Sequence, residues 1–198
     1  QCKLILFLPL FAFLIQIFFG KRLPRGGDWV SISAIAITLL LALSMFISML
    51  SEYNPELRHE SSFTWIDMGE FKIKLGFLID NLTIIMLLVV ALISTCTHVF
   101  STQYLKGDVR YSRYFGYLGL FTFSMNGIVL ANNLISMYMF WELVGVSSYL
   151  LIGHWFEKES AANASKKAFL TNRVGDIGFF IGIMLIYNAI GSFAFLDI

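Results

Sequence analysis

The chain has 198 residues, of which 58% are hydrophobic and only 14% are charged, and its mean hydropathy is +0.75. A water-soluble domain of this size does not carry so apolar a surface, so the composition indicates an integral membrane protein. The net charge of +1 and the lack of basic runs argue against a nucleic-acid-binding protein.

Six apolar segments can each cross a hydrocarbon core, which takes about 20 helical residues. In chain order the expected spans are residues 3–19, 29–50, 81–103, 113–131, 134–153 and 166–190. No small-residue cleavage site follows the first segment, so it is interpreted as a transmembrane helix and not as a signal peptide. The sequence therefore predicts an all-α polytopic membrane protein.

Basic residues are divided unequally between the two ends of these spans. Three connections on one side hold nine of them, namely Lys21, Arg22, Arg25, Lys106, Arg110, Arg113, Lys158, Lys166 and Lys167. The other side holds four, namely Lys3, Arg58, Lys72 and Lys74. By the positive-inside rule, the nine-charge side is cytoplasmic, or matrix or stromal in an organelle, and the N-terminus lies outside.

The long connection on the outer side has a different pattern. Between residues 63 and 77, apolar and polar residues alternate on both sides of an Asp67-Met-Gly-Glu70 sequence. This alternation predicts a β-hairpin at the outer membrane surface, with its turn at residues 67–70. We expect it to cap the bundle or to brace neighbouring subunits.

Glu142 is the only formally charged residue between Tyr114 and Phe156, a run of 43 residues. It lies about nine residues into the fifth span, which places its carboxylate roughly 13 Å below the surface and close to the membrane midplane. A charged side chain at that depth is costly, and such residues usually face a bundle interior and mark ion or proton pathways. Glu142 is therefore the first candidate functional residue.

The sixth span carries Arg173 and Asp176. If that helix enters the membrane near Lys166, Asp176 lies roughly 15 Å deep, at the level of Glu142. Residues three apart on a helix can form an ion pair. Two interpretations stay open. The pair neutralises itself and pins the helix, or Arg173 tunes proton affinity, because a nearby cation favours the charged carboxylate while desolvation disfavours it.

Other polar residues carry weaker signals. His98, near the inner end of the third span, is interpreted as an interfacial structural residue, with a proton-relay role as the alternative. Cys2 and Cys96 are read as small apolar fillers. The sequence has no GxGxxG, Walker or metal-ligand spacing, so we expect neither a cofactor site nor a metal site in this chain.

Three stretches together resemble a known family. They are Phe140-Trp-Glu-Leu-Val-Gly-Val-Ser-Ser-Tyr-Leu-Leu-Ile-Gly153, Ala161-Ala-Asn-Ala-Ser-Lys-Lys-Ala-Phe169 and Thr171-Asn-Arg-Val-Gly-Asp-Ile-Gly178. The chain is similar over essentially its whole length to subunit L of NADH-quinone oxidoreductase. This is an antiporter-like subunit of the membrane arm of respiratory complex I, with mitochondrial and chloroplast NDH counterparts.

The resemblance implies a proton-translocating subunit that carries no redox centre and couples quinone reduction to proton pumping. It implies that Glu142 is the switchable carboxylate, Asp176 a modulatory or proton-accepting neighbour and Arg173 its counter-charge. Lys167 either steers an entry path or simply anchors the helix at the interface. In the family, the glutamate matching Glu142 pairs with a lysine on the seventh helix, which should lie beyond Ile198.

The resemblance also implies the surroundings of the chain. NADH, FMN, iron–sulfur clusters and quinone are expected in other subunits of the complex. The expected partners are other membrane-arm subunits, especially the neighbouring antiporter-like subunit M, and the lipid bilayer, with no nucleic acid. The expected membrane is the bacterial inner membrane, or the mitochondrial inner or thylakoid membrane.

Members of this family are several times longer than this chain. We therefore expect residues 1–198 to be the N-terminal transmembrane bundle of an antiporter-like subunit, without its C-terminal spans and lateral helix. A subunit of an Mrp-type sodium/proton antiporter is the main alternative, and the run from Asn172 to Asp176 favours the redox-driven pump over it. A purely structural scaffold would leave the buried Glu142 unexplained.

Overall fold

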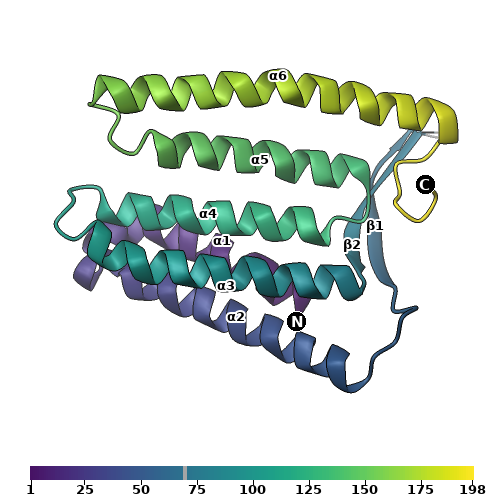
Figure 1. Cartoon of the computed structure of the whole chain (residues 1–198), viewed down its shortest axis with the longest axis horizontal. Coiled ribbons are helices and arrows are strands. Elements are labelled where there is room, and N and C mark those ends of the chain that lie inside the picture. Colours follow the sequence, from purple (N-terminus) through teal and green to yellow (C-terminus); the bar gives the residue numbers. More distant parts are fainter. Residues whose placement is uncertain (69–70) are drawn as a thin grey trace. The chain divides into compact units, whose positions relative to one another are not determined.

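In the computed structural model, residues 1–68 and 71–198 are described, and they form six α-helices and one two-stranded antiparallel sheet (Figure 1). The chain divides into two compact units. Unit 1 contains residues 1–56 and 81–126, and unit 2 contains residues 57–80 and 127–198.

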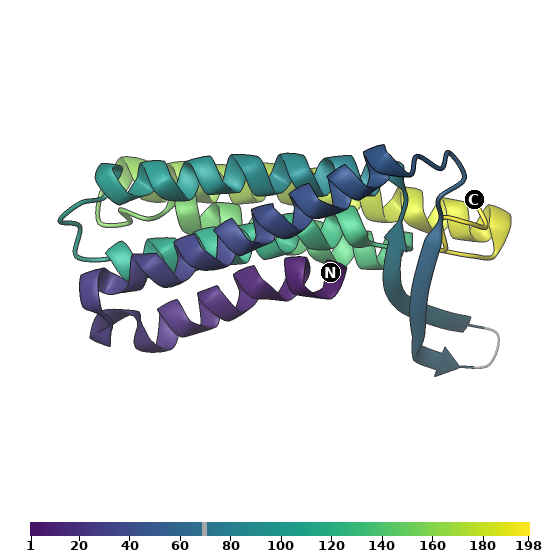
Figure 2. The ribbon, with the colours of Figure 1, turned by 90° about the horizontal axis from the view of Figure 1, so that it is seen from below.

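Unit 1 is a helical bundle. It contains α1 (Cys2–Phe19), α2 (Asp28–Ser51), α3 (Asn81–Tyr104) and α4 (Tyr111–Leu130) as far as Asn126. Two short 3-10 helices, Gly20–Arg22 and Pro24–Gly27, connect α1 to α2. Gly26 and Gly27 have φ values of +70° and +75°, a conformation that glycine adopts without steric cost, and the chain here turns back so that α2 lies beside α1 (Figure 2).

Small residues and polar side chains hold unit 1 together. A Cβ atom added to Gly119 would lie 3.0 Å from the carbonyl oxygen of Pro9, so the backbones of α4 and α1 approach closely there. At one end of the bundle, the Ser112 hydroxyl donates to the Gly26 carbonyl over 2.8 Å. The two basic connections of unit 1 therefore meet at one end, as the charge distribution predicted; which side of the membrane this end faces stays a prediction.

Unit 2 contains the hairpin and the last two helices. Strands β1 (His59–Met68) and β2 (Phe71–Ile79) pair in antiparallel register, from His59 opposite Ile79 to Met68 opposite Phe71 (Figure 2). This confirms the hairpin predicted around residues 63–77. Residues 69 and 70 of its expected turn lie outside the described residues. Helices α5 (Leu134–Ile152) and α6 (Glu159–Ile190) pack together through aromatic rings.

The helices match the six predicted spans, with one notable shift. Helix α6 begins at Glu159, seven residues before the predicted start, because the polar stretch ahead of Lys166 is rich in helix-forming residues. Within the described residues, α1, α2, α3, α5 and α6 are long and apolar enough to span a membrane. Helix α4, which corresponds to the predicted span 113–131, is not among these helices, because Arg113, Asn126 and several tyrosines lower its hydropathy.

Candidate functional site

Helices α5 and α6 bring the three central charged residues together in unit 2. The Arg173 guanidinium donates to Oε2 of Glu142, and this hydrogen-bonded ion pair is the closest contact of the cluster. The same Nη1 atom of Arg173 lies 4.0 Å from Oδ2 of Asp176. The predicted Arg173–Asp176 pair therefore exists, but Arg173 binds the carboxylate of the other helix more closely.

Two aromatic side chains complete the hydrogen bonding of the carboxylates. The Tyr138 hydroxyl donates to Oε1 of Glu142 over 2.9 Å. The Trp141 indole N–H donates to Oδ1 of Asp176, also over 2.9 Å. Each carboxylate thus has one oxygen near Arg173 and the other on an uncharged donor, which is the kind of pairing that a carboxylate removed from water requires.

Helical spacing explains how α5 presents these groups. Tyr138 and Glu142 are four residues apart and therefore lie on one face of the helix. The rings of Tyr138 and Trp141 both pack edge-on against Phe179 of α6, with centroids 5.6 Å and 5.7 Å apart. The same aromatic contacts that join the two helices therefore fix the donors next to Glu142 and Asp176.

The cluster lies near the middle of both helices. Glu142 is the ninth of 19 residues in α5, and Asp176 is the eighteenth of 32 in α6. Direct bonds from Arg173 and Trp141 connect the two levels. The expected position of Glu142, about 13 Å from the start of its helix, and its shared level with Asp176 agree with this geometry.

The burial of the three charged side chains is graded. The Asp176 side chain is 9% exposed, Glu142 is 22% exposed and Arg173 is 41% exposed. Lys167 is exposed and lies six residues before Arg173, about 9 Å along α6. The structure thus brings together Glu142, Arg173 and Asp176 and leaves Lys167 apart from them.

Tyr138 and Trp141 belong to the cluster, and sequence reasoning missed both. The spacing of four residues from Glu142 was a usable signal for Tyr138. Trp141 had no such signal, because its partner Asp176 lies 35 positions away on another helix.

The cluster has two carboxylates and one guanidinium, so it holds one more negative than positive charge when all three groups are ionised. Arg173 can neutralise only one carboxylate fully, and a proton on either carboxylate changes which of them the guanidinium prefers. The arrangement can therefore couple a proton to the position of an arginine side chain. Among the described residues, His, Cys, Asp and Glu form no group that could hold a metal ion.

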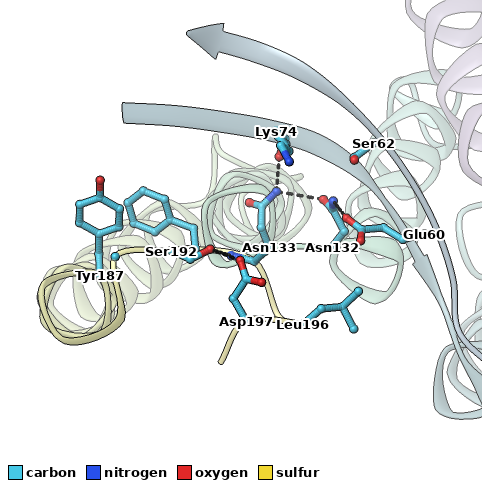
Figure 3. A pocket seen from close by; sticks show the side chains of 12 residues that line it. Glu60, Ser62, Lys74, Asn132, Asn133, Tyr187, Ser192, Leu196 and Asp197 are labelled. Carbon is cyan, nitrogen blue, oxygen red and sulfur yellow. Dashed lines mark hydrogen bonds between the residues drawn. The ribbon is translucent and has the colours of Figure 1, made fainter. Parts of the chain in front are cut away.

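A polar cavity of about 480 Å³ lies in unit 2 at the start of α5 (Figure 3). The Asn132 amide donates to Oε1 of Glu60 over 2.7 Å, and the Asn133 amide donates to the carbonyl of Lys74. Oδ1 of Asn133 accepts the backbone N–H of Ser136 over 2.7 Å and caps α5. The Asn132-Asn133 break between two spans thus anchors the helix that carries Glu142 to the hairpin.

These features define a multi-pass membrane protein with a charged cluster between two of its helices. One solved structure with the same fold is the membrane-bound sulfane sulfur reductase, an archaeal respiratory membrane complex. A chain of that complex superposes with a TM-score of 0.81 over 98% of this chain and 38% of its own, at 19% sequence identity.

Two family models each match part of the chain. Residues 65–115 match the family described as NADH-ubiquinone oxidoreductase (complex I), chain 5 N-terminus. Residues 131–198 match the family described as NADH:quinone oxidoreductase/Mrp antiporter, transmembrane region. The first match is specific to chain 5 of complex I, whereas the second covers both NADH:quinone oxidoreductase and Mrp antiporter subunits and includes the whole charged cluster.

Similar proteins include chloroplast NAD(P)H-quinone oxidoreductase subunit 5 from several plants and algae. The protein from Physcomitrium patens is 43% identical over 94% of this chain, and that from Chlorokybus atmophyticus is 44% identical over 95%. The chain spans 27% and 30% of the length of these two relatives. The likeness is therefore to one part of a longer subunit.

Proposed function

We propose that residues 1–198 act as the N-terminal transmembrane bundle of subunit L, the antiporter-like subunit of an NADH:quinone oxidoreductase, in proton translocation coupled to quinone reduction. The observation that carries the proposal is the sharing of Arg173 between Glu142 and Asp176. Identity above 40% to subunit 5 proteins over nearly the whole chain supports it.

The mechanism uses the choice that Arg173 has between two carboxylates. With Glu142 ionised, Arg173 binds it, and Asp176 is held by the Trp141 indole. A proton that arrives on Glu142 removes the negative charge there, so Arg173 then favours Asp176. When the guanidinium returns, it favours release of that proton from Glu142. Lys167, nine ångströms or so nearer the basic end of α6, either steers protons toward the cluster or anchors the helix.

The proposed role also specifies the cofactors, partners and membrane of the subunit. The chain acts as a non-redox, translocase-type subunit, while NADH, FMN, iron–sulfur clusters and quinone belong to other subunits. Its partners are other membrane-arm subunits, with subunit M as the neighbour, and the hairpin braces that contact. A lysine on a later helix is the further partner of Glu142. The membrane is an energy-coupling membrane of the bacterial inner, mitochondrial inner or thylakoid type.

An Mrp-type sodium/proton antiporter is the second candidate, because the family that matches residues 131–198 includes Mrp antiporters by its description. Co-purification separates the two. A pump subunit is expected to purify with flavin and iron–sulfur absorbance, whereas an antiporter subunit is expected to purify without either.

The direct test is Glu142→Gln in the full-length protein, with proton pumping and NADH oxidation measured in membrane vesicles and assembly followed on a native gel. We expect an assembled complex that has lost pumping and oxidises NADH more slowly. Glu159→Gln is the matched control, because Glu159 is an exposed carboxylate at the start of α6. Pumping by Glu142→Gln at the level of the control would overturn the proposal.

A further inference from the structure

Buried polar side chains extend through the interior of unit 1, apart from the charged cluster of unit 2. They include Gln16 of α1, Ser94 and His98 of α3, and Thr122 and Asn126 of α4. His98 and Asn126 are 0% exposed, and Thr122 is 1% exposed. Polar groups within membrane spans are costly unless they are hydrogen-bonded and usually mark a functional path.

The hydrogen bonding of His98 determines which ring nitrogen needs a partner. Nδ1 lies 2.8 Å from the carbonyl oxygen of Ser94, so Nδ1 carries the hydrogen and donates it. Nε2 of the neutral ring is then an acceptor with a free lone pair. It is buried and has no hydrogen-bond partner among the described residues. A donor is therefore required at Nε2.

The same requirement recurs at Gln16 and Asn126. The Asn126 amide N–H donates to the carbonyl of Ile5 over 3.1 Å, and the Gln16 amide N–H groups donate to the Gly27 carbonyl and the Ser31 hydroxyl. In the described part of the chain, the carbonyl oxygens of both side chains are buried without a donor. All three unpartnered atoms are acceptors, and water is the donor that buried acceptors of this kind bind.

Polar groups lie at both ends and in the middle of unit 1, and the apolar Phe115 ring lies between those of the basic end and His98. At the basic end, the Tyr111 hydroxyl donates to Asp28 over 3.0 Å, and the Tyr111 ring packs on Phe115. The Phe115 ring lies 6.0 Å from the His98 ring. Further along α3, the hydroxyl of Ser94 lies 3.3 Å from Nδ1 of His98.

The second half of the row lies on α4. The hydroxyls of Ser94 and Thr122 are hydrogen-bonded at 2.7 Å, which joins α3 to α4. Asn126 is four residues beyond Thr122, so it lies on the same face about 6 Å further along α4. Its bond to Ile5 reaches the first turn of α1, at the opposite end of the bundle from Asp28.

We propose that internal waters bind at Gln16, His98 and Asn126, and that the hydrated row is a proton path through unit 1 in which His98 transfers the proton. The water sites stand on the hydrogen bonding alone, whereas proton transfer rests on the proposed function. In the transfer, Nε2 accepts a proton from a protonated water and Nδ1 releases its own to the Ser94 hydroxyl. Ser94 passes its hydrogen to Thr122, and the hydrogen that Thr122 donates to the Leu118 carbonyl moves to the next water. One proton is thus transferred, and the imidazole is left neutral with its hydrogen on Nε2.

The water site is tested by radiolytic footprinting of the assembled complex in ¹⁸O-labelled water. Hydroxyl radicals formed from bound water label the side chains next to it. We expect ¹⁸O incorporation at His98 and none at Leu87, a residue of the same helix that is 1% exposed and has only apolar side-chain atoms. Absence of label at His98 would overturn the water site. This outcome does not depend on whether the complex pumps protons.

Proton transfer is tested with His98→Gln and His98→Phe in the full-length protein. Glutamine keeps polar atoms that can hold the water but cannot carry an extra proton, and phenylalanine can do neither. We expect both variants to assemble and to lose pumping relative to NADH oxidation, with ¹⁸O label at position 98 and its neighbours retained only in His98→Gln. Thr97→Val is the control, because Thr97 is only half-buried and its hydroxyl donates to the Ile93 carbonyl of its own helix.

If His98→Gln pumps as well as the unmodified protein, His98 has a structural role only, and the proton step is overturned. Pumping by Glu142→Gln shows whether a negative result concerns only the proton step at His98 or the proposed function as a whole. If Glu142→Gln loses pumping while both His98 variants pump normally, the path through unit 1 is wrong and the role of the charged cluster stands.

Discussion

Units 1 and 2 both bury polar side chains, but they satisfy them differently. Away from the basic end of unit 1, where Asp28 is buried beside Arg25, the interior polar groups are hydroxyls, amides and one imidazole, and many hydroxyls donate to a carbonyl of their own helix, as Thr38 and Ser124 do. In unit 2 the central groups are two carboxylates and a guanidinium, and they bind one another across two helices. A neutral polar group needs only local partners, whereas a buried charge needs an opposite charge on a neighbouring element. The unit with charges therefore depends more strongly on a single side chain.

That side chain is Arg173, and its loss gives the largest expected effect. Arg173→Gln leaves Glu142 and Asp176 without their cation. Because the Arg173 side chain is 41% exposed, the loss is smaller than for a fully buried pair, and the charge-assisted hydrogen bond to Glu142 sets it at about 2–3 kcal/mol. We expect a marked fall in the temperature at which the complex is lost from a native gel, together with loss of pumping. Lys166→Gln removes an exposed cation of the same helix and is expected to change stability by less than about 0.5 kcal/mol. Equal stability of the two variants would contradict the contrast between the units.

The next effect concerns the anchoring of α5. Asn133→Ala removes the cap on the Ser136 N–H and the bond to the Lys74 carbonyl. Together these contribute about 2 kcal/mol. We expect faster proteolysis of the hairpin and a lower melting temperature, with pumping reduced because the position of Glu142 is less defined. Asn163→Ala, at an exposed position of α6, is the control. An unchanged proteolysis rate would show that the hairpin does not hold α5.

The elements that each carry a local signal were predictable from sequence. Every apolar run gave a helix, and the alternation in residues 63–77 gave the hairpin. The start of α6 was wrong because hydropathy marks where a helix enters the membrane, while the helix itself begins seven residues earlier at Glu159. Side-chain hydropathy sets where the helix enters the membrane, whereas helix propensity sets where the helix starts.

The partners within the charged cluster were only partly predictable. Spacing along one helix gave the Arg173–Asp176 pair, which is present at 4.0 Å. The closer contact with Glu142 joins residues 31 positions apart, and it depends on how α6 is rotated against α5. Aromatic packing around Phe179 sets that rotation, and a single sequence does not reveal it. The resemblance to a family named Glu142, Arg173 and Asp176, which the structure brings together, without giving their geometry.

The third prediction concerns the neutral hydrogen bonds in the interior of unit 1. Thr122→Val keeps the shape of the side chain but removes the hydroxyl that binds Ser94. The expected loss is about 1 kcal/mol, because only neutral hydrogen bonds disappear, the one with Ser94 and the one to the Leu118 carbonyl. A double-mutant cycle with Ser94→Ala measures the coupling directly. Coupling as large as that between Arg173 and Glu142 would remove the distinction between neutral and charged interiors.

The smallest expected effect on stability comes from Tyr138→Phe, and it separates folding from function within unit 2. The variant removes one donor to Oε1 of Glu142 and leaves both the Arg173 contact and the ring packing on Phe179 in place. We expect a loss of stability of roughly 0.5–1 kcal/mol. The effect on pumping should be larger than this value suggests, because Oε1 of Glu142 loses the hydrogen bond that fixes the carboxylate beside Arg173. The ratio of proton pumping to NADH oxidation in membrane vesicles measures this effect. Tyr149→Phe changes a tyrosine of the same helix that packs on Phe169 outside the cluster, and it is expected to leave the ratio unchanged. Equal ratios for Tyr138→Phe and Tyr149→Phe would mean that the Tyr138 hydroxyl does not contribute to pumping, and Arg173 alone would then hold the carboxylate in place.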